Sequence, residues 1–285
     1  GVTTQQVIPV KDEAVFDKLK EFGIKQIASR TAGVDMFGLD MAREREIAIT
    51  NVPRYSPNAI AELAVSHTMQ LLRNVNRIRN AMSKGDFSWN KELISREIRS
   101  CTVGIIGTGK IGLTTAQLFK GLGAKIIGYD KFRNPDAEGV LEYKDTVEEL
   151  LKESDVVSLH LPLNDETYHL IDKEKIDMMK KGAILINTGR GALVNIEDVI
   201  DALESGKLSG AGIDVLECET IYVNQKIDVN NIKDTEVEKL MNMENVVLTG
   251  HFAFFTETAV DNLVSTALDN IRIQVETDEI RNCMN

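Results

Sequence analysis

The sequence contains no apolar run long enough to span a bilayer, no internal repeat and no low-complexity tract. Basic residues are in deficit: 33 Lys and Arg oppose 44 Asp and Glu, which gives a formal net charge of −11. This balance disfavours nucleic acids and anionic membranes as partners, because both present dense negative charge. The net charge does not exclude a small anionic substrate, because one cation can dominate the electrostatic potential of a cleft.

Cysteine and histidine are also scarce. Cys101, Cys218 and Cys283 show no C-x-x-C spacing, which indicates reduced thiols in a cytoplasmic protein rather than a disulfide framework. The four histidines are scattered and form no His-x-x-x-His pair, so we expect no metal site.

The 285 residues give room for two domains. From residue 101 onward, short β-branched runs alternate with helical patterns, and the runs are almost wholly apolar, as in parallel strands covered on both faces. This alternation predicts a doubly wound parallel sheet. The expected strands are residues 102–106, 125–129, 155–159, 183–187, 211–215 and 245–249.

The two ends of the chain follow a different pattern. Near the start we expect a helix over 13–22, short strands at 25–28 and 48–51, and a long helix after Asn58; the end is again helical. The simplest arrangement places residues 1–53 and 254–285 in a second, smaller domain and residues 54–253 in the doubly wound one. The chain then crosses twice, near Arg54 and near Ala253.

The strongest local motif is a G-x-G-x-x-G turn formed by Gly107, Gly109 and Gly112. An expected strand runs into it and an expected helix leaves from it, as in a dinucleotide site whose pyrophosphate lies at a helix N-terminus. Asp130 ends the next strand, where a carboxylate accepts hydrogen bonds from a ribose diol and repels a 2′-phosphate. The motif therefore predicts NAD rather than NADP, although Lys131 and Arg133 weaken that preference.

Three further strand ends carry side chains suited to reducing a 2-oxo acid: Arg190, Glu219 and His251. An arginine fork suits a carboxylate, and a His–Glu pair suits a proton donor. Each also has a structural alternative, because Arg190 can form a surface pair and Glu219 can be solvated loop charge. His160 ends a strand as well, Asp214 fits a buried hydrogen-bonding role as well as a cofactor role, and His67 fits a structural role within a helix.

Several stretches together resemble the D-isomer-specific 2-hydroxyacid dehydrogenase family over nearly the whole chain. They are VGIIGTGKIG (103–112), DVVSLHLPL (155–163), MKKGAILINTGRG (179–191), GIDVLECE (212–219) and His251 with the aromatics after it. Within the family, YSPNAIAE (55–62), FFT (254–256) and the long insert after Glu219 are most similar to the D-lactate and (R)-2-hydroxyisocaproate dehydrogenase branch.

The resemblance implies a Rossmann domain inserted in a smaller flavodoxin-like α/β substrate domain, in a homodimer formed through the long helix after Asn58. It implies that the catalytic residues are Arg190, Glu219 and His251. Substrate contacts implied in the same way are Gly33, Val34, Tyr55, Arg190 and Phe254. The resemblance also implies contacts with NAD. Together with the residues of the glycine turn, the predicted NAD contacts are Gly107, Gly109, Lys110, Ile111, Gly112, Asp130, Leu161, Pro162, Thr167, Thr188, Gly189, Arg190 and Asp214.

The expected activity is the reduction of pyruvate, or a close 2-oxo acid, to the (R)-hydroxy acid with NADH. Alternatives are (R)-2-hydroxyisocaproate, phenyllactate or 2-hydroxyglutarate dehydrogenase activity, and, from another class, an NAD-sensing scaffold without turnover. The chain departs from the family pattern in three places: Gly250 replaces a proline, Asn195 an aspartate, and Phe252 a smaller residue.

Overall fold

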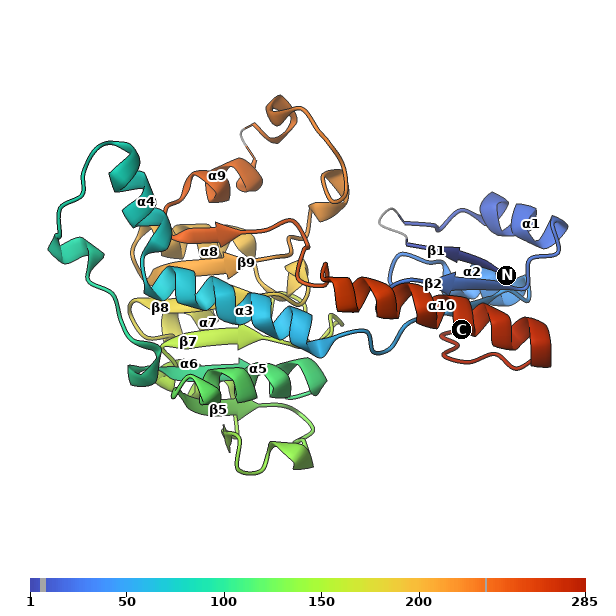
Figure 1. Cartoon of the computed structure of the whole chain (residues 1–285), viewed down its shortest axis with the longest axis horizontal. Helices are drawn as coiled ribbons and strands as arrows, with labels where there is room; N and C mark the ends of the chain where they lie inside the picture. The colour runs from blue at the N-terminus through green and yellow to red at the C-terminus, as the bar shows by residue number, and fades with distance from the viewer. Residues whose placement is uncertain (6–8, 234) are drawn as a thin grey trace. The chain divides into compact units, whose positions relative to one another are not determined.

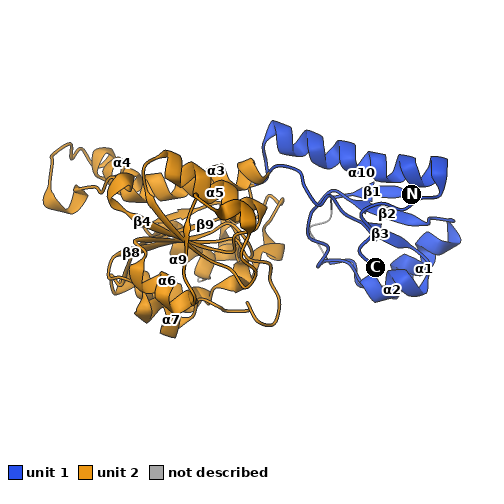
Figure 2. Ribbon diagram, turned by 90° about the horizontal axis from the view of Figure 1, so that it is seen from below, with its two compact units in different colours: residues 1–56, 254–285 blue, residues 57–253 orange. Residues whose placement is uncertain are grey.

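The computed structural model describes residues 1–5, 9–233 and 235–285. The chain forms two compact units: unit 1 comprises Gly1–Ser56 and Phe254–Asn285, and unit 2 comprises Pro57–Ala253 (Figure 2). The first boundary lies after Ser56 rather than after residue 53, because Pro57 opens a long helix and proline is well suited to a first helical turn. None of the helices in the described ranges is long and apolar enough to cross a membrane.

Unit 2 is built on a sheet of seven parallel strands in the order β10-β9-β8-β7-β4-β5-β6 (Figure 1). The chain order reverses at β4, which pairs with β5 on one side and β7 on the other. The expected doubly wound fold is thus confirmed, with its switch point beside β4. The strands are β4 (Thr102–Ile106), β5 (Lys125–Tyr129), β6 (Glu142–Tyr143), β7 (Val156–Leu159), β8 (Ala183–Asn187), β9 (Leu208–Ile213) and β10 (Val246–Leu248).

Helices cover both faces of this sheet (Figure 2). Helices α3 (Pro57–Leu72) and α5 (Lys110–Gly121) pack on one face, where Val103, Ile105 and Phe119 share a buried cluster. On the other face, Ile106 and Leu159 pack with α6 (Val147–Glu153), α7 (Lys173–Met178) and α8 (Ile196–Glu204). Apolar residues fill both faces, which explains the continuous apolar runs in the sequence.

Local capping explains where several helices begin. Asp172 accepts a hydrogen bond from the Lys175 N–H at the start of α7, and Asn195 accepts one from the Asp198 N–H at the start of α8. Both satisfy an N–H that has no partner within the helix. Asn195 is thus an effective cap at the position where the family pattern has aspartate.

The structure corrects the strand expected at 211–215. The observed β9 begins at Leu208 and ends at Ile213, so Asp214 lies beyond the strand. The reason is that Leu208, Gly210 and the residues after them pair with β8, whereas the buried Asp214 side chain hydrogen-bonds another segment. Two further helices of unit 2 are α4 (Val75–Ser83) and α9 (Glu236–Asn242).

Unit 1 is a smaller α/β unit with a parallel sheet in the order β1-β2-β3. Helix α10 packs on one face through Leu263 and Ala267, and α1 packs on the other through Phe16 (Figure 2). The C-terminal segment returns to this sheet, where the backbone of Cys283 forms an isolated antiparallel β-bridge with Thr50. The elements are β1 (Val2–Thr4), α1 (Glu13–Glu21), β2 (Gln26–Ser29), α2 (Leu39–Glu44), β3 (Ala48–Thr50) and α10 (Glu257–Thr277).

Candidate active site

The glycine turn follows β4 at the switch point of the unit 2 sheet. Gly107 has a φ of +92°, and a Cβ added there would lie 2.6 Å from the carbonyl oxygen of His160. A Cβ at Gly112 would overlap the carbonyl oxygen of Gly107. A Cβ at Gly109, by contrast, would meet nothing within 4 Å. Two glycines are therefore required by the fold, and the third leaves open space of the kind that a pyrophosphate needs.

Helix α5 begins directly after this turn, at Lys110 and Ile111, and no side chain caps its first N–H groups. Such an N-terminus suits a phosphate. At the end of β5, the half-buried Asp130 carboxylate accepts the Thr108 N–H at 2.7 Å and the Phe132 N–H at 3.0 Å. Asp130 therefore fixes the turn, beside the place predicted for the ribose.

Two cations close to Asp130 in sequence are each paired with a carboxylate. Lys131 Nζ lies 2.9 Å from Glu166, and Arg133 Nη2 lies 2.5 Å from Asp145. The Arg133 guanidinium also lies over the Tyr143 ring. A cation that already has a carboxylate partner attracts a 2′-phosphate less strongly, so the structure removes much of the reason to expect NADP.

The other predicted cofactor residues lie in the loops after β7 and β8. Thr167 Oγ1 donates to the carbonyl oxygen of Pro162 at 2.8 Å, which closes the loop that carries Leu161. After β8, the buried Thr188 Oγ1 finds no hydrogen-bond partner among the described residues. An orphaned buried hydroxyl is uncommon and fits a group that a bound dinucleotide completes. Gly189 follows it; the NAD contacts of these residues stay predictions.

Arg190 lies in a turn that Asn187 holds in place. The Asn187 side chain donates to the Arg190 carbonyl oxygen at 2.8 Å and accepts the Gly189 N–H at 3.1 Å. A Cβ at Gly191 would overlap the backbone of Leu216, so the arginine turn lies directly against the loop that follows β9. Sequence reasoning missed Asn187, although a polar residue that ends an apolar strand is a usable signal.

Glu219 and His251 meet as the sequence predicted: Glu219 Oε1 lies 3.0 Å from His251 Nδ1. Both side chains are about one quarter to one third exposed. The second carboxylate oxygen, Glu219 Oε2, is buried without a hydrogen-bond partner among the described residues. His251 has a φ of +62°, a backbone conformation that costs a non-glycine residue free energy and is common at functional sites.

Asp214 holds the turn that carries His251. Its buried carboxylate accepts the N–H groups of Phe252 at 2.8 Å and Ala253 at 2.9 Å and the hydroxyl of Thr249, and its carbonyl oxygen accepts the His251 N–H at 2.6 Å. The sequence left two roles open for Asp214. The buried hydrogen-bonding role is present in the structure, and the cofactor role stays a prediction. Gly250 and Phe252, two of the departures from the family pattern, belong to this turn.

The strand-end alternative His160 has a buried Nδ1 that finds no hydrogen-bond partner among the described residues. Burial lowers its pKa to about 3, so the ring is neutral at physiological pH, and its Nε2 lies 2.9 Å from Ser158 Oγ within the same segment. His160 is therefore poorly suited to donate a proton in catalysis, whereas His251 has a carboxylate partner.

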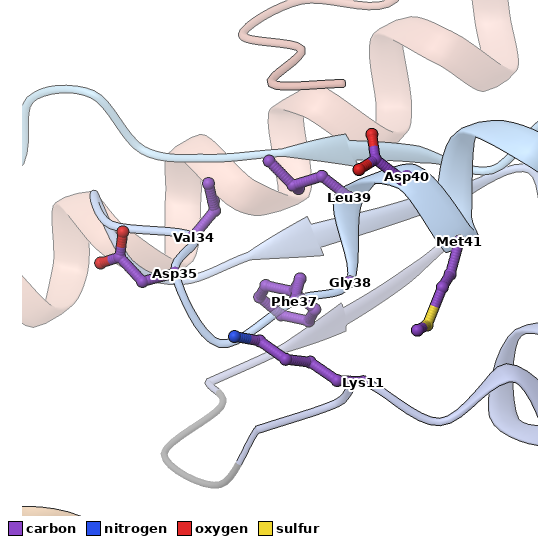
Figure 3. A pocket seen from close by; sticks show the side chains of 8 residues that line it. All are labelled: Lys11, Val34, Asp35, Phe37, Gly38, Leu39, Asp40 and Met41. Carbon is purple, nitrogen blue, oxygen red and sulfur yellow. The ribbon is translucent and has the colours of Figure 1, made fainter. Parts of the chain in front are cut away.

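The remaining predicted substrate residues belong to unit 1. Tyr55 and Phe254 pack against one apolar cluster formed by Ala28, Val52, Leu263 and Ala267. Gly33 and Val34 follow β2, and the Gly33 carbonyl oxygen accepts the Thr31 hydroxyl at 2.6 Å. Val34 also lines a hollow of about 390 Å³ within unit 1 (Figure 3). Lys11, Asp35 and Asp40 supply the charged groups of this hollow, which includes none of Arg190, Glu219 and His251 of unit 2.

Comparison with known proteins decides the family. Residues 65–253 match the family model described as "D-isomer specific 2-hydroxyacid dehydrogenase, NAD binding domain". The chain belongs to this family. It is an NAD-dependent oxidoreductase of the D-2-hydroxyacid dehydrogenase type, and its cofactor is NAD.

Individual relatives cover almost the full chain. It is 46% identical over 285 residues to a D-2-hydroxyacid dehydrogenase (NAD(+)) of Clostridioides difficile, which spans 100% of this chain and 86% of that protein. It is 46% identical to a D-lactate dehydrogenase of Streptococcus agalactiae, over 97% of this chain and 84% of that one. The crystal structure of Lactobacillus jensenii D-lactate dehydrogenase with NAD+ superposes with a TM-score of 0.90 at 39% identity, covering 100% of this chain and 86% of that one.

Proposed function

We propose that this dehydrogenase reduces pyruvate, or a close 2-oxo acid, to the (R)-2-hydroxy acid with NADH. The observation that carries the proposal is the 3.0 Å hydrogen bond between Glu219 Oε1 and His251 Nδ1. Glu219, His251 and Arg190 follow the carboxyl ends of three parallel strands, β9, β10 and β8, so all three lie at the edge that carries the glycine turn.

Each side chain has a distinct role in this proposal. The Arg190 guanidinium binds the substrate carboxylate through two parallel hydrogen bonds and polarises the ketone. The His251 imidazolium donates a proton from Nε2 to the carbonyl oxygen and becomes neutral, while the Glu219 carboxylate at Nδ1 stabilises the charged ring and fixes its orientation. Bound NADH supplies the hydride for the carbonyl carbon, so one 2-oxo acid, one NADH and one proton give one hydroxy acid and NAD+.

The cofactor and substrate contacts complete the proposal. The open space at Gly109, the uncapped first turn of α5 and the orphaned Thr188 hydroxyl support the NAD contacts predicted from the sequence. In unit 1, the Gly33 and Val34 backbone, Tyr55 and Phe254 are the proposed contacts for the rest of the substrate.

Pyruvate is favoured because the relative from Streptococcus agalactiae is named a D-lactate dehydrogenase. The catalytic cluster suits 2-oxoisocaproate, phenylpyruvate and 2-oxoglutarate equally well, because it contacts only the oxo acid group that all four share. A kcat/KM series over these four acids, with chiral analysis of the product, tests the proposal. We expect the highest value with pyruvate and an (R)-product; no NADH oxidation with any of the four would overturn it.

We also propose a homodimer. The segment between α4 and β4 exposes Phe87, Trp89 and Ile94, with Trp89 fully exposed and Phe87 70% exposed. Large apolar side chains exposed in one segment indicate an interaction site. The family resemblance implies a second copy of the chain as the partner, with the long helix after Asn58 in the interface, and we propose that this segment, which follows α3 and α4, extends that interface. Trp89 is the only tryptophan, so its emission reports on this segment alone. A dimer by light scattering with blue-shifted emission supports the proposal; a monomer at micromolar concentration contradicts it.

A cytoplasmic location is proposed on compositional grounds. Cys101, Cys218 and Cys283 are unpaired thiols in the described structure, and such thiols persist in reducing compartments. Cell fractionation with an NADH-linked assay checks this location, and activity in an oxidising compartment would contradict it.

A further inference from the structure

One buried histidine lies beneath the catalytic turn and has no role in the mechanism above. His67 sits on α3 and is 1% exposed. Its ring packs against β9 at Gly212, where an added Cβ would come within 2.7 Å of the His67 Cβ. The strand therefore lacks a side chain at the one place where the imidazole needs room.

The other side of the imidazole faces Thr249, next to the catalytic turn. Thr249 Oγ1 lies 3.4 Å from His67 Nε2 and also hydrogen-bonds Asp214 Oδ1. In the second of these hydrogen bonds Thr249 is the donor and Asp214 Oδ1 the acceptor, so the threonine uses its only hydroxyl proton there. Thr249 can then only accept from the imidazole, which requires that His67 carries its proton on Nε2.

Two observations agree with this direction. His67 Nδ1 is buried and has no hydrogen-bond partner among the described residues, as expected for the nitrogen without a proton. Burial also lowers the pKa of His67 to about 4, against the opposing charge of Asp214, so the ring is neutral at physiological pH. A neutral ring protonated at Nε2 completes a chain of donors that runs from His67 through Thr249 to Asp214.

We propose that His67 is a positioning residue for the catalytic histidine, acting through Thr249 and Asp214. The inference rests on the proposed function of His251. Asp214 holds the turn through the N–H groups of Phe252 and Ala253, and His251 lies in this turn with a left-handed backbone. By fixing the Thr249 hydroxyl, His67 fixes the carboxylate that keeps His251 in that conformation, because hydrogen bonds in a chain polarise and orient one another.

Histidine NMR tests the relay without turnover. The chain has only four histidines, so ¹⁵N-histidine spectra of the full chain resolve each ring. We expect His67 to show a protonated Nε2 and an unprotonated Nδ1 from pH 8 to pH 5. A proton on Nδ1, or titration of this ring in that range, would overturn the relay.

Substitutions then test the effect on His251. His67→Phe removes the donor, and we expect kcat with pyruvate and NADH to fall about fivefold, the worth of one net hydrogen bond, with NADH affinity within twofold and a shifted His251 signal. His67→Gln can still donate and should restore kcat to within about twofold of the wild type. Thr249→Val should lower kcat more than Thr249→Ser does, because the serine keeps the hydroxyl.

A control variant separates positioning from stability. Thr68 is buried on the same helix, and its hydroxyl bonds only the Ala64 carbonyl oxygen among the described contacts. Thr68→Ala should lower the melting temperature and leave kcat and the His251 signal unchanged. If His67→Phe behaves in the same way, His67 only packs, and the inference is wrong. If the wild type reduces no 2-oxo acid, the proposed function fails, while the His67 tautomer and the His251 shift still decide the relay.

Discussion

The cofactor turn and the catalytic cluster lie at the same edge of one sheet, and they are built by different means. The turn itself is one continuous segment, in which Gly112 is required by the Gly107 carbonyl oxygen, whereas Gly107 is required by the backbone of His160 at the end of the neighbouring strand β7. The cluster comes from three loops that are far apart in sequence. Buried hydrogen bonds of Asn187 hold the turn of Arg190, and those of Asp214 hold the turn of His251. Substitutions that add volume should therefore disrupt the turn, whereas substitutions that remove hydrogen bonds or charge should disrupt the cluster.

The turn gives the largest expected effect. Gly112→Ala places a methyl group on the Gly107 carbonyl, so we expect no stably folded protein. The added Cβ of Gly109→Ala meets no atom within 4 Å, so this variant should keep the wild-type melting temperature. We expect it to weaken NADH binding by at least about tenfold, because the proposed position of the pyrophosphate fills that space. Calorimetry of unfolding and of NADH binding measures both. Wild-type NADH affinity in Gly109→Ala would contradict the assigned pyrophosphate position.

Arg190→Lys should damage the catalytic cluster while sparing the fold. A lysine keeps the charge and loses the fork, so we expect kcat/KM for pyruvate to fall about 100-fold, through both kcat and KM. Arg272→Lys, on the exposed surface of α10, is the matched control and should leave both parameters unchanged. Equal behaviour of the two variants would remove Arg190 from the proposed substrate site.

Asp130→Asn should change which cofactor is used. In the proposed site the neutral amide forms weaker hydrogen bonds with the ribose, so we expect kcat/KM with NADH to fall about tenfold and kcat/KM with NADPH to fall less. Asp145→Asn removes the partner of Arg133 and leaves Asp130 intact, so NADH kinetics should be unchanged. If NADPH matches NADH in the wild type, the role of Asp130 is wrong.

A further expected effect concerns the pH dependence of stability rather than catalysis. The pKa of His67 is lowered by burial from 6.5 to about 4. Between these values the unfolded chain binds a proton that the folded chain does not, so stability falls as pH drops through this window. We expect a loss of about 2 kcal/mol between pH 7 and pH 5 from this residue.

Urea unfolding at the two pH values measures that loss. His67→Gln should flatten the dependence by this amount, and the remaining slope includes His160, whose pKa burial also lowers. An unchanged slope in His67→Gln would show that His67 is not buried in the neutral form.

The sequence predicted the parts that one segment determines. The strands β4, β5 and β8 and the glycine turn follow from local pattern. What it could not provide was the side-chain network between segments. Asn187 beneath the Arg190 turn, and Thr249 with Asp214 beneath His251, depend on loops that meet only after folding. The end of β9 was misplaced for the same reason.

The most direct test of the account compares NADH binding with catalysis in His251→Gln. Glutamine retains a polar side chain at the end of the Asp214 turn but cannot act as the proton donor at neutral pH. We predict that NADH affinity stays within twofold of the wild type while kcat with pyruvate falls about 100-fold or more. A kcat within a few-fold of the wild type would contradict the assignment of His251 and, with it, the proposed mechanism.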